Sequence, residues 1–224
     1  MAKNGENGSV LITGGTSGLG RACVETFLKS GWSVATFGRR MDLISELREI
    51  YFGSSLIAEV CDLRVSNHVD NVLDRVKMKF QRLDVIILNA GELGRTPLAT
   101  VEQLELNDFR TVFETNFFGN ISIVQKIMRL FPGGKEVFVH ITSDAGSNPY
   151  PKWGPYGPSK AAMDFLFKIL QSENINNQRR FLSFDPGDMN TEMHRKALPE
   201  DKPETLKDPM KSAAELESLL KEMI

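Results

Sequence analysis

Short apolar runs alternate with amphipathic helical patterns along most of this chain. The runs are continuous rather than alternating in polarity, as strands buried on both faces of a parallel sheet require. They predict strands over residues 9–13, 33–37, 56–60, 84–88, 135–142 and 181–184. Apolar residues at helical spacing predict a helix from Leu19 until Gly31, and further helices over 41–51, 66–80, 107–131 and 156–174. Ser66 is expected to cap the third of these helices, and Pro132-Gly133-Gly134 to end the fourth.

This alternation of strand and helix predicts an α/β fold with helices on both faces of one sheet, a Rossmann-type doubly wound parallel sheet. No internal repeat, low-complexity tract or linker interrupts the pattern, so a single domain over 1–224 is expected. Residues 192–224 are expected to form a short charged lid and an amphipathic closing helix after Pro209, with no further strand.

Composition narrows the class of protein. The chain has 224 residues, a formal net charge of -2 and no basic block, so nucleic acid is not an expected partner. No apolar stretch is long enough to span a membrane, and the polar first residues do not resemble a signal peptide. Cys23 and Cys61 have no metal-ligand spacing, and we expect reduced packing residues of a cytoplasmic protein and no metal.

A glycine-rich segment, Gly14-Gly15-Thr16-Ser17-Gly18-Leu19-Gly20, directly follows the first predicted strand and leads into a helix. Glycines allow a tight turn and close backbone approach, and a helix N-terminus supplies N–H groups and a positive dipole end. Strand, turn and helix in this order predict a site for dinucleotide phosphates.

Tyr156 and Lys160 form a second candidate site. If the segment is helical, their spacing places a phenol and an ammonium on one face, about one turn apart. A nearby ammonium favours the phenolate and lowers the phenol pKa towards neutral pH, where proton transfer is efficient. The spacing alone is weak evidence, because chance supplies it in many helices.

Together, Thr13-Gly14-x-x-x-Gly18-x-Gly20 and Tyr156-x-x-x-Lys160 resemble the short-chain dehydrogenase/reductase family. The resemblance runs from about Ser9 to Thr191. Further landmarks occur in order, namely Asp62-Leu63, Asn89-Ala90-Gly91, Asn116, Ser143, Pro186-Gly187 and Thr191.

The resemblance implies four catalytic residues. Tyr156 would protonate the carbonyl oxygen, Ser143 would donate a hydrogen bond to it, and Lys160 would lower the pKa of Tyr156 and hold the nicotinamide ribose. Asn116 would disturb its helix locally and bind a water that relays protons to Lys160. Thr142 and Ser147 lack the family's separation from Tyr156.

The end of the second strand indicates the cofactor. Enzymes that prefer NAD usually place a carboxylate there, whereas this chain has Gly38-Arg39-Arg40, and guanidinium groups suit a 2′-phosphate. NADP(H) is therefore the preferred cofactor, with NAD(H) as the alternative and Arg39 expected to contribute more than Arg40. The residues expected to contact the cofactor are Gly14, Thr16, Ser17, Gly18, Leu19, Gly20, Arg39, Arg40, Asp62, Leu63, Asn89, Ala90, Gly91, Tyr156, Lys160, Pro186, Gly187, Met189 and Thr191.

Other polar and aromatic residues are weaker candidates. Tyr150 has no lysine four residues on and is expected to line the pocket, while Trp153 either walls the substrate site or packs in a loop. His140 is expected to be a hydrogen-bonded core histidine, and His194 a lid residue with a substrate contact as the lesser alternative. Asp188 introduces a carboxylate near the pocket, compatible with a polar or cationic substrate group or with a loop cap.

Two functions remain open from the sequence. The first is an NADP(H)-dependent oxidoreductase that interconverts a small-molecule carbonyl and alcohol; the second is a catalytically idle NADP(H)-binding sensor on the same fold. Reduction of an enoyl double bond is disfavoured, because such relatives space tyrosine and lysine more widely. By resemblance, the helices that carry Asn116 and Tyr156 would form a homodimer face. The missing final strand argues against a tetramer.

Overall fold

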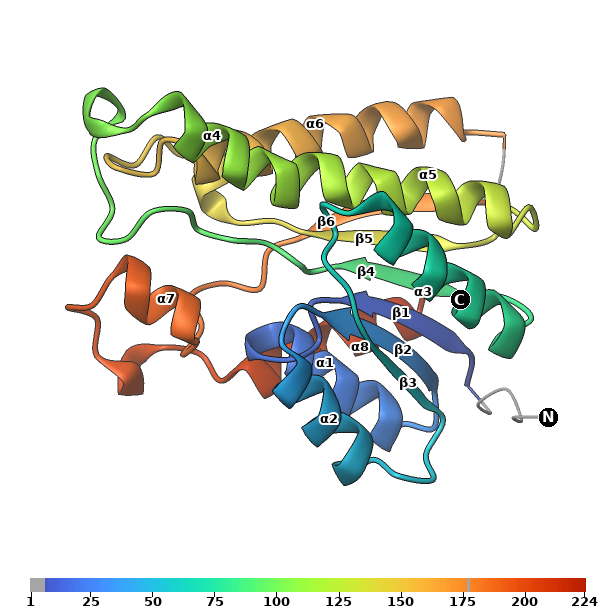
Figure 1. Cartoon of the computed structure of the whole chain (residues 1–224). Coiled ribbons are helices and arrows are strands. Elements are labelled where there is room, and N and C mark those ends of the chain that lie inside the picture. The colour runs from blue at the N-terminus through green and yellow to red at the C-terminus, as the bar shows by residue number, and fades with distance from the viewer. Residues whose placement is uncertain (1–6, 177) are drawn as a thin grey trace.

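The computed structural model describes residues 7–176 and 178–224, and a six-stranded parallel sheet forms its centre (Figure 1). The strands are adjacent in the order β3-β2-β1-β4-β5-β6, and all neighbours run parallel. Their bounds are β1 Ser9–Thr13, β2 Ser33–Gly38, β3 Leu56–Val60, β4 Val85–Leu88, β5 Val137–Ile141 and β6 Arg180–Phe184. The predicted strands and the predicted fold class are confirmed.

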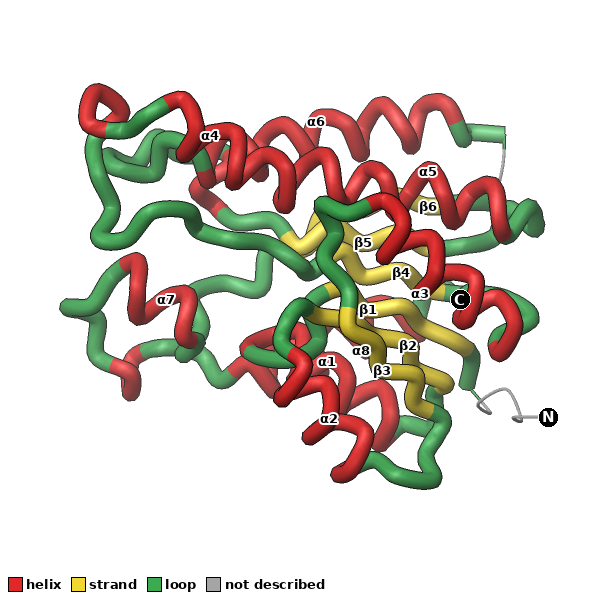
Figure 2. Tube along the Cα trace, in the orientation of Figure 1, coloured by secondary structure: helices red, strands yellow, loops and turns green. Residues whose placement is uncertain are grey.

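Helices cover both faces of this sheet (Figures 1 and 2). One face packs against α1 (Gly18–Lys29), α2 (Met41–Ile50) and α8 (Pro209–Lys221). The other packs against α3 (Ser66–Lys79), α5 (Asn120–Leu130) and α6 (Tyr156–Glu173). Two further helices are α4 (Leu106–Phe113), which precedes α5, and α7 (Glu192–Ala197), which lies apart from the sheet.

Continuous apolar strands are needed because each strand supplies both layers of the core. Side chains alternate between the two faces of a strand. In β1, Leu11 packs on the α3, α5 and α6 side, whereas Val10 and Ile12 pack on the α1, α2 and α8 side. All three side chains are fully buried. A polar residue at any of these positions would therefore enter one core or the other.

The strand order reverses between β1 and β4, and this reversal positions the site. β1 pairs with β2 on one side and with β4 on the other, so the segments that follow β1 and β4 leave the sheet towards opposite faces. In open α/β sheets, ligands bind in the crevice at the carboxyl ends of the strands at such a point. The loop after β4 and helix α7 both lie beyond this end of the sheet (Figure 1).

The helix predicted over 107–131 is interrupted. α4 ends at Phe113, a π-helical turn covers Glu114–Gly119, and α5 begins at Asn120. π turns inside α-helices are rare and occur frequently at functional sites. The helical stretch predicted over 107–131 is present as α4, the π turn and α5, and the local disturbance expected around Asn116 is found. The C-terminal end is as predicted, because α5 stops at Leu130, just before Pro132.

Ser66 does not cap α3. It is the first residue of the helix, Val65 holds the N-cap position, and no side chain caps this N-terminus. The Ser66 hydroxyl instead donates to Asp70 Oδ2 at 3.3 Å and accepts from Lys126 Nζ at 2.9 Å. The serine therefore joins α3 to α5, and its predicted role as a cap is wrong.

Both cysteines are core residues, as predicted. Cys23 lies in the α1 layer and Cys61 in the opposite layer, and each is a free thiol. Burial raises the pKa of both thiols to about 12, and Asp62 adds to the effect at Cys61. Neither group has the low pKa of a reactive thiol.

Helix α8 ends the fold by packing against α1. Asp208 caps the helix by accepting from Met210 N at 2.9 Å, and Pro209 occupies its first turn. Its buried face includes Ala213, Leu216 and Leu220. Within the described residues no strand follows β6.

Candidate active site

The glycine-rich turn after β1 packs too closely on itself and its neighbours to accept a side chain at Gly20. Gly14 has a φ of 71°, which glycine adopts at little cost. A Cβ at Gly20 would lie 2.3 Å from the carbonyl oxygen of Gly14 and 2.5 Å from Asn89 Nδ2. The turn leads into the N-terminus of α1, where no side chain caps the first N–H groups. Uncapped amides and the helix dipole attract phosphate, so this turn fits the pyrophosphate of a dinucleotide.

The segment after β4 fixes the position of this turn. Asn89 Nδ2 donates to the carbonyl oxygens of Thr13 at 3.0 Å and Gly14 at 3.3 Å. The backbone N–H of Ala90 donates to Thr13 Oγ1 at 2.8 Å. Asn89 therefore joins the carboxyl ends of β1 and β4.

Two guanidinium groups lie at the end of β2. Arg40 Nη2 donates to Ser17 Oγ in the glycine-rich turn at 2.7 Å, and its Nη1 is 3.8 Å from Glu192 Oε2 in α7. Arg39 Nη1 is 3.5 Å from Glu92 Oε2, just after Asn89-Ala90-Gly91. Both arginine side chains stay about half exposed, at 53% and 46%. They can therefore still bind an anion beside the turn.

Asp62 follows β3 and is held by a neighbouring arginine. Arg64 donates to both carboxylate oxygens, with Nη2 2.6 Å from Oδ2 and Nε 3.0 Å from Oδ1. These hydrogen bonds lower the pKa of Asp62 below its usual value, and the charges of Arg64 and Arg39 act in the same direction. Leu63 turns its side chain into the core, so only its backbone could contact a nucleotide.

Asn116 joins the π turn to two other parts of the site. Its Nδ2 donates to the Glu92 carbonyl oxygen and to Ser159 Oγ, both at 3.0 Å, and its Oδ1 accepts from Glu92 N at 2.8 Å. A Cβ at Gly91 would lie 3.4 Å from Asn116 Oδ1 and 3.8 Å from Lys160 Nζ. Asn116 and Lys160 therefore lie against the same glycine. The π turn brings this amide, which is almost fully buried, towards α6.

Tyr156 and Lys160 lie in the first turn and a half of α6. Lys160 Nζ is 5.4 Å from the centre of the Tyr156 ring and donates to the Ile141 carbonyl oxygen at 2.7 Å. Burial lowers the pKa of Lys160 to about 8, although Asp164 and Asp185 oppose this shift.

The pKa of Tyr156 moves in the opposite direction from the sequence expectation. It is raised, chiefly because burial disfavours the phenolate, and the negative charges of Asp185 and Asp144 add to the effect. Lys160 was expected to lower this pKa, but burial and the two carboxylates raise it instead. The arrangement keeps the phenol protonated, which is the form that can donate a proton.

Ser143 lies at the carboxyl end of β5 and begins the short 3₁₀ turn Asp144–Gly146. Its Oγ accepts from Ala145 N at 3.2 Å and lies 3.2 Å from Asp144 Oδ1. This turn packs closely on the start of α6, because a Cβ at Gly157 would lie 2.6 Å from the Ala145 carbonyl oxygen. The packing brings Ser143 and Tyr156 to the same end of the sheet.

The segment after β6 returns over the glycine-rich turn. Pro186-Gly187 turns the chain, with Gly187 at a φ of 76°, and Thr191 Oγ1 caps α7 by accepting from His194 N at 3.2 Å. A Cβ at Gly18 would be 3.4 Å from Thr191 Cγ2, so the segment that leads into α7 lies against the turn. Met189 pairs with Lys207 in an isolated parallel bridge, which closes the base of the 192–207 segment.

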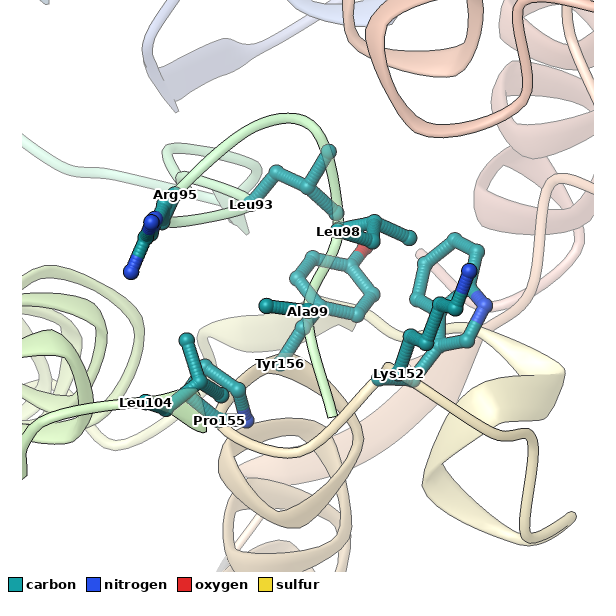
Figure 3. Close-up of a pocket in the computed structure, with 9 residues that line it drawn as sticks. Leu93, Arg95, Leu98, Ala99, Leu104, Lys152, Pro155 and Tyr156 are labelled. Carbon is teal, nitrogen blue, oxygen red and sulfur yellow. The ribbon is translucent and has the colours of Figure 1, made fainter. Parts of the chain in front are cut away.

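A small pocket opens in front of Tyr156 (Figure 3). Its walls come from the loop after β4 and from the segment that leads into α6. They are formed by Leu93, Arg95, Leu98, Ala99, Leu104, Lys152, Trp153, Pro155 and Tyr156. Trp153 lines this pocket, where the interpretation as a wall of the substrate site would place it. The sequence prediction did not include the lining residues from the loop after β4.

Two predictions about neighbouring residues are wrong. Tyr150 does not line this pocket; it is 45% exposed, and its hydroxyl donates to Asp144 Oδ2 at 2.6 Å. His140 is buried as expected, but neither ring nitrogen has a hydrogen-bond partner among the described residues. Burial lowers the pKa of His140 well below its usual value, and the charge of Lys160 adds to this shift, so the ring is neutral.

His194 in the lid and Asp188 in the turn before it also lie outside the pocket lining. His194 Nε2 is 2.8 Å from Asp201 Oδ2, and its Nδ1 is 3.8 Å from Asp188 Oδ1. The histidine is therefore hydrogen-bonded within the lid, to Asp201. The Asp188 side chain is 80% exposed and is not part of the pocket lining.

Sequence reasoning missed four residues that hold the site together: Glu92, Asn120, Ser159 and Asp164. Asn120 Nδ2 donates to the carbonyl oxygens of Ala90 at 3.1 Å and Asn116 at 3.0 Å. Asp164 Oδ2 accepts from Thr142 Oγ1 at 2.6 Å. Asn120 and Asp164 each lie four residues after a predicted site residue, which could have signalled a shared helix face. No comparable spacing points to Glu92.

The described residues contain neither a candidate metal cluster nor a helix suited to span a membrane. Across 7–176 and 178–224, no group of three or more histidine, cysteine or acidic side chains is placed to hold a metal ion. In the same residues no helix is both long and apolar enough to cross a membrane.

Comparison with known proteins agrees with this geometry. The family model described as short chain dehydrogenase matches residues 8–202. The chain is 30% identical to a serine 3-dehydrogenase of Agrobacterium fabrum over 191 residues, which cover 83% of this chain and 74% of that protein. It is 32% identical to sulfoacetaldehyde reductase 2 of Chromohalobacter salexigens over 186 residues, 82% of this chain and 73% of that protein.

Solved structures share the fold. A closed form of serine dehydrogenase in complex with NADP+ superposes with a TM-score of 0.83 at 24% identity, over 94% of this chain and 88% of that one. The family match covers most of the chain, including the glycine-rich turn and the Tyr156–Lys160 pair. We conclude that this protein belongs to the short-chain dehydrogenase/reductase family, whose enzymes use a nicotinamide dinucleotide to interconvert alcohols and carbonyl compounds.

Proposed function

We propose that this enzyme is an NADP(H)-dependent carbonyl reductase or alcohol dehydrogenase in which Tyr156 is the general acid and base. One observation carries the proposal: Tyr156 lines the pocket at the carboxyl end of the sheet, and the buried Lys160 ammonium lies 5.4 Å from its ring. The phenol therefore faces the space where a substrate can enter, while the lysine is shielded from water.

The cofactor's phosphates would bind at the uncapped N-terminus of α1, with Ser17 and the glycines of the turn around them. Thr191 lies against Gly18, where it would help to close the site over the cofactor. When bound, the nicotinamide supplies or accepts the hydride.

The remaining chemistry belongs to side chains of this protein. In reduction, negative charge develops on the substrate oxygen, and the protonated Tyr156 phenol donates its proton to that oxygen. Ser143 Oγ would turn from Asp144 to donate a second hydrogen bond to the same oxygen. Lys160 stabilises the phenolate that remains after the proton transfer, because its ammonium lies beside the ring. Asn116 positions α6 through Ser159.

A preference for NADP(H) is supported by the end of β2. Arg39 and Arg40 place two half-exposed guanidinium groups beside the turn, suited to a 2′-phosphate. A carboxylate at Gly38, the feature expected of NAD-dependent enzymes, is disfavoured sterically. A Cβ at Gly38 would lie 2.7 Å from Thr16 Cγ2.

We also propose that the protein is a homodimer through the face formed by the π turn and α6. Phe118, Phe165 and Ile169 are exposed, and Phe165 and Ile169 lie four residues apart on one side of α6. Exposed apolar side chains gathered on one face are typical of an interface. Light scattering should give twice the monomer mass, and Phe165→Glu should give a monomer. A wild-type monomer would contradict the proposal.

The test of the main proposal is NADPH oxidation by purified protein with a panel of aldehydes, ketones and dicarbonyl compounds. We expect turnover of at least one compound class, and faster turnover with NADPH than with NADH. Tight NADPH binding without oxidation across the panel would contradict the proposed reaction and favour a cofactor sensor.

A further inference from the structure

The pocket in front of Tyr156 has positive charge at its rim. Of the nine lining residues, Arg95 and Lys152 are charged and none is acidic. They come from different segments, Arg95 from the loop after β4 and Lys152 from the loop before α6. In Figure 3 they stand on either side of the Tyr156 ring. The rest of the lining is mainly apolar.

Neither of these cations is neutralised by the protein. Arg95 makes one long hydrogen bond, from Nη1 to the Gln103 carbonyl oxygen at 3.4 Å. Among the described residues, the ion pairs within 4.0 Å include neither Arg95 nor Lys152. The arginines on the nucleotide side are all paired, Arg39 with Glu92, Arg40 with Glu192 and Arg64 with Asp62. Arg95 and Lys152 therefore carry positive charge at the pocket rim without a carboxylate partner within 4.0 Å among the described residues.

The backbone of Lys152 is unusual. Its φ of 72° is left-handed, and within the described residues no other non-glycine residue has a positive φ. Lysine has no intrinsic preference for this conformation, which asparagine and glycine tolerate better. Such a conformation persists where the surrounding structure holds it in place. The loop thus fixes the point from which this cation reaches the rim.

We propose that the substrate is a small carbonyl compound with an anionic group, and that Arg95 and Lys152 recognise this group. The apolar body of the substrate would pack against Leu93, Leu98 and Trp153, and its carbonyl group would be directed to Tyr156. Positively charged groups around a pocket raise the local concentration of anions and hold them by charge-assisted hydrogen bonds. The proposal rests on the proposed reductase function and adds the charge of its substrate.

A matched pair of aldehydes tests the charge requirement. 4-Formylbenzoate and its methyl ester have a similar shape and differ in charge, and 4-formylbenzenesulfonate tests whether a sulfonate serves as well as a carboxylate. We expect kcat/KM to be at least about fivefold higher for the better anion than for the ester. A factor of this size corresponds to the free energy of one favourable exposed ion pair. Added NaCl should raise KM for the anion and leave the ester unchanged.

Two single substitutions test whether Arg95 and Lys152 recognise the anionic group. Arg95→Gln and Lys152→Asn remove each charge, and asparagine accommodates the left-handed backbone. Each should lower kcat/KM for the anion about fivefold and leave the ester within twofold. Lys79→Gln is the control, because Lys79 is an exposed lysine of α3 outside the pocket and the substitution changes the net charge equally. An equal loss in Lys79→Gln would mean a general charge effect and overturn the proposal.

The outcomes separate this inference from the proposed function. Equal turnover of anion and ester, unaffected by either variant, would overturn the anionic substrate while the reductase function stands. If neither aldehyde is reduced, saturation-transfer NMR with NADPH present compares the binding of benzoate and methyl benzoate. Stronger binding of benzoate that is lost in Arg95→Gln or Lys152→Asn would still support the anion site. No preference for benzoate would overturn it.

Discussion

Asn116 Nδ2 and Ser159 Oγ are joined by a buried hydrogen bond of 3.0 Å that connects the π turn to the helix of Tyr156 and Lys160. Ser159 Oγ also donates to the Tyr156 carbonyl oxygen at 2.7 Å. The contact links two segments 43 residues apart in the chain. It therefore sets the position of α6 relative to the π turn.

Ser159→Ala should lower both stability and activity. The substitution leaves one buried N–H of Asn116 without an acceptor, which costs about 1–3 kcal/mol in the free energy of unfolding. Denaturant unfolding measures this loss. Ser172→Ala is the matched control, since Ser172 is an exposed serine of the same helix whose hydroxyl bonds only the Ile169 carbonyl oxygen. Equal stability of the two variants would show that the Asn116–Ser159 contact contributes nothing.

Tyr156→Phe should remove the proton donor and leave the fold in place. General acid catalysis contributes about two to four powers of ten, so we expect kcat to fall by that factor while the NADPH dissociation constant stays nearly constant. The control is Tyr150→Phe, because the Tyr150 hydroxyl bonds Asp144 outside the pocket. Near-normal turnover of Tyr156→Phe would rule out the proposed role of this phenol.

Arg39→Gln and Arg40→Gln should each weaken NADPH binding far more than NADH binding. A hydrogen bond to a charged group contributes about 1.5–3 kcal/mol, roughly ten- to a hundredfold in affinity, and NADH has no 2′-phosphate to lose. Fluorescence titration gives both dissociation constants. The sequence predicts the larger contribution for Arg39, whereas in the structure Arg40 contacts the turn directly. Comparison of the two single variants shows which arginine contributes more to NADPH binding. If wild type binds NADH as tightly as NADPH, the preference for NADP(H) is wrong.

Reductase activity should fall as pH rises through about 8, where Lys160 loses its proton. Asp164 raises the pKa of Lys160, so Asp164→Asn should move this fall to lower pH, while exposed Asp74→Asn on α3 should not. The measurement is the pH profile of kcat/KM for wild type, Asp164→Asn and Asp74→Asn. An unchanged profile in Asp164→Asn would contradict the coupling.

The same pKa shift gives a stability test with a defined sign. Between about 8 and the usual lysine value of 10.5, the unfolded chain binds a proton that folded Lys160 lacks. The free energy of unfolding, relative to Lys160→Met, should therefore rise with pH across this window. A relative stability that falls with pH would show that Lys160 stays protonated in the folded protein.

The sequence by itself determined the elements and the local motifs. Continuous apolar runs such as Val10-Leu11-Ile12 identify strands buried on both faces, because each strand feeds two cores. The glycine-rich turn and the Tyr156–Lys160 spacing are readable because their geometry depends on residues close together in the chain. The apolar periodicity predicts the helix after residue 106. It does not reveal the π turn, because a π turn adds only one residue to one helical turn and barely changes the pattern.

Tertiary structure alone decided which distant side chains meet. Arg40 reaches Ser17 across 23 residues, and Arg95 and Lys152 share one pocket rim although they belong to separate loops. His140 has no hydrogen-bond partner among the described residues, and Tyr150 turns away to Asp144. Such contacts depend on the path of loops and on the packing of helices across the sheet. A local pattern specifies which face of an element is buried, and it does not specify what that face will touch.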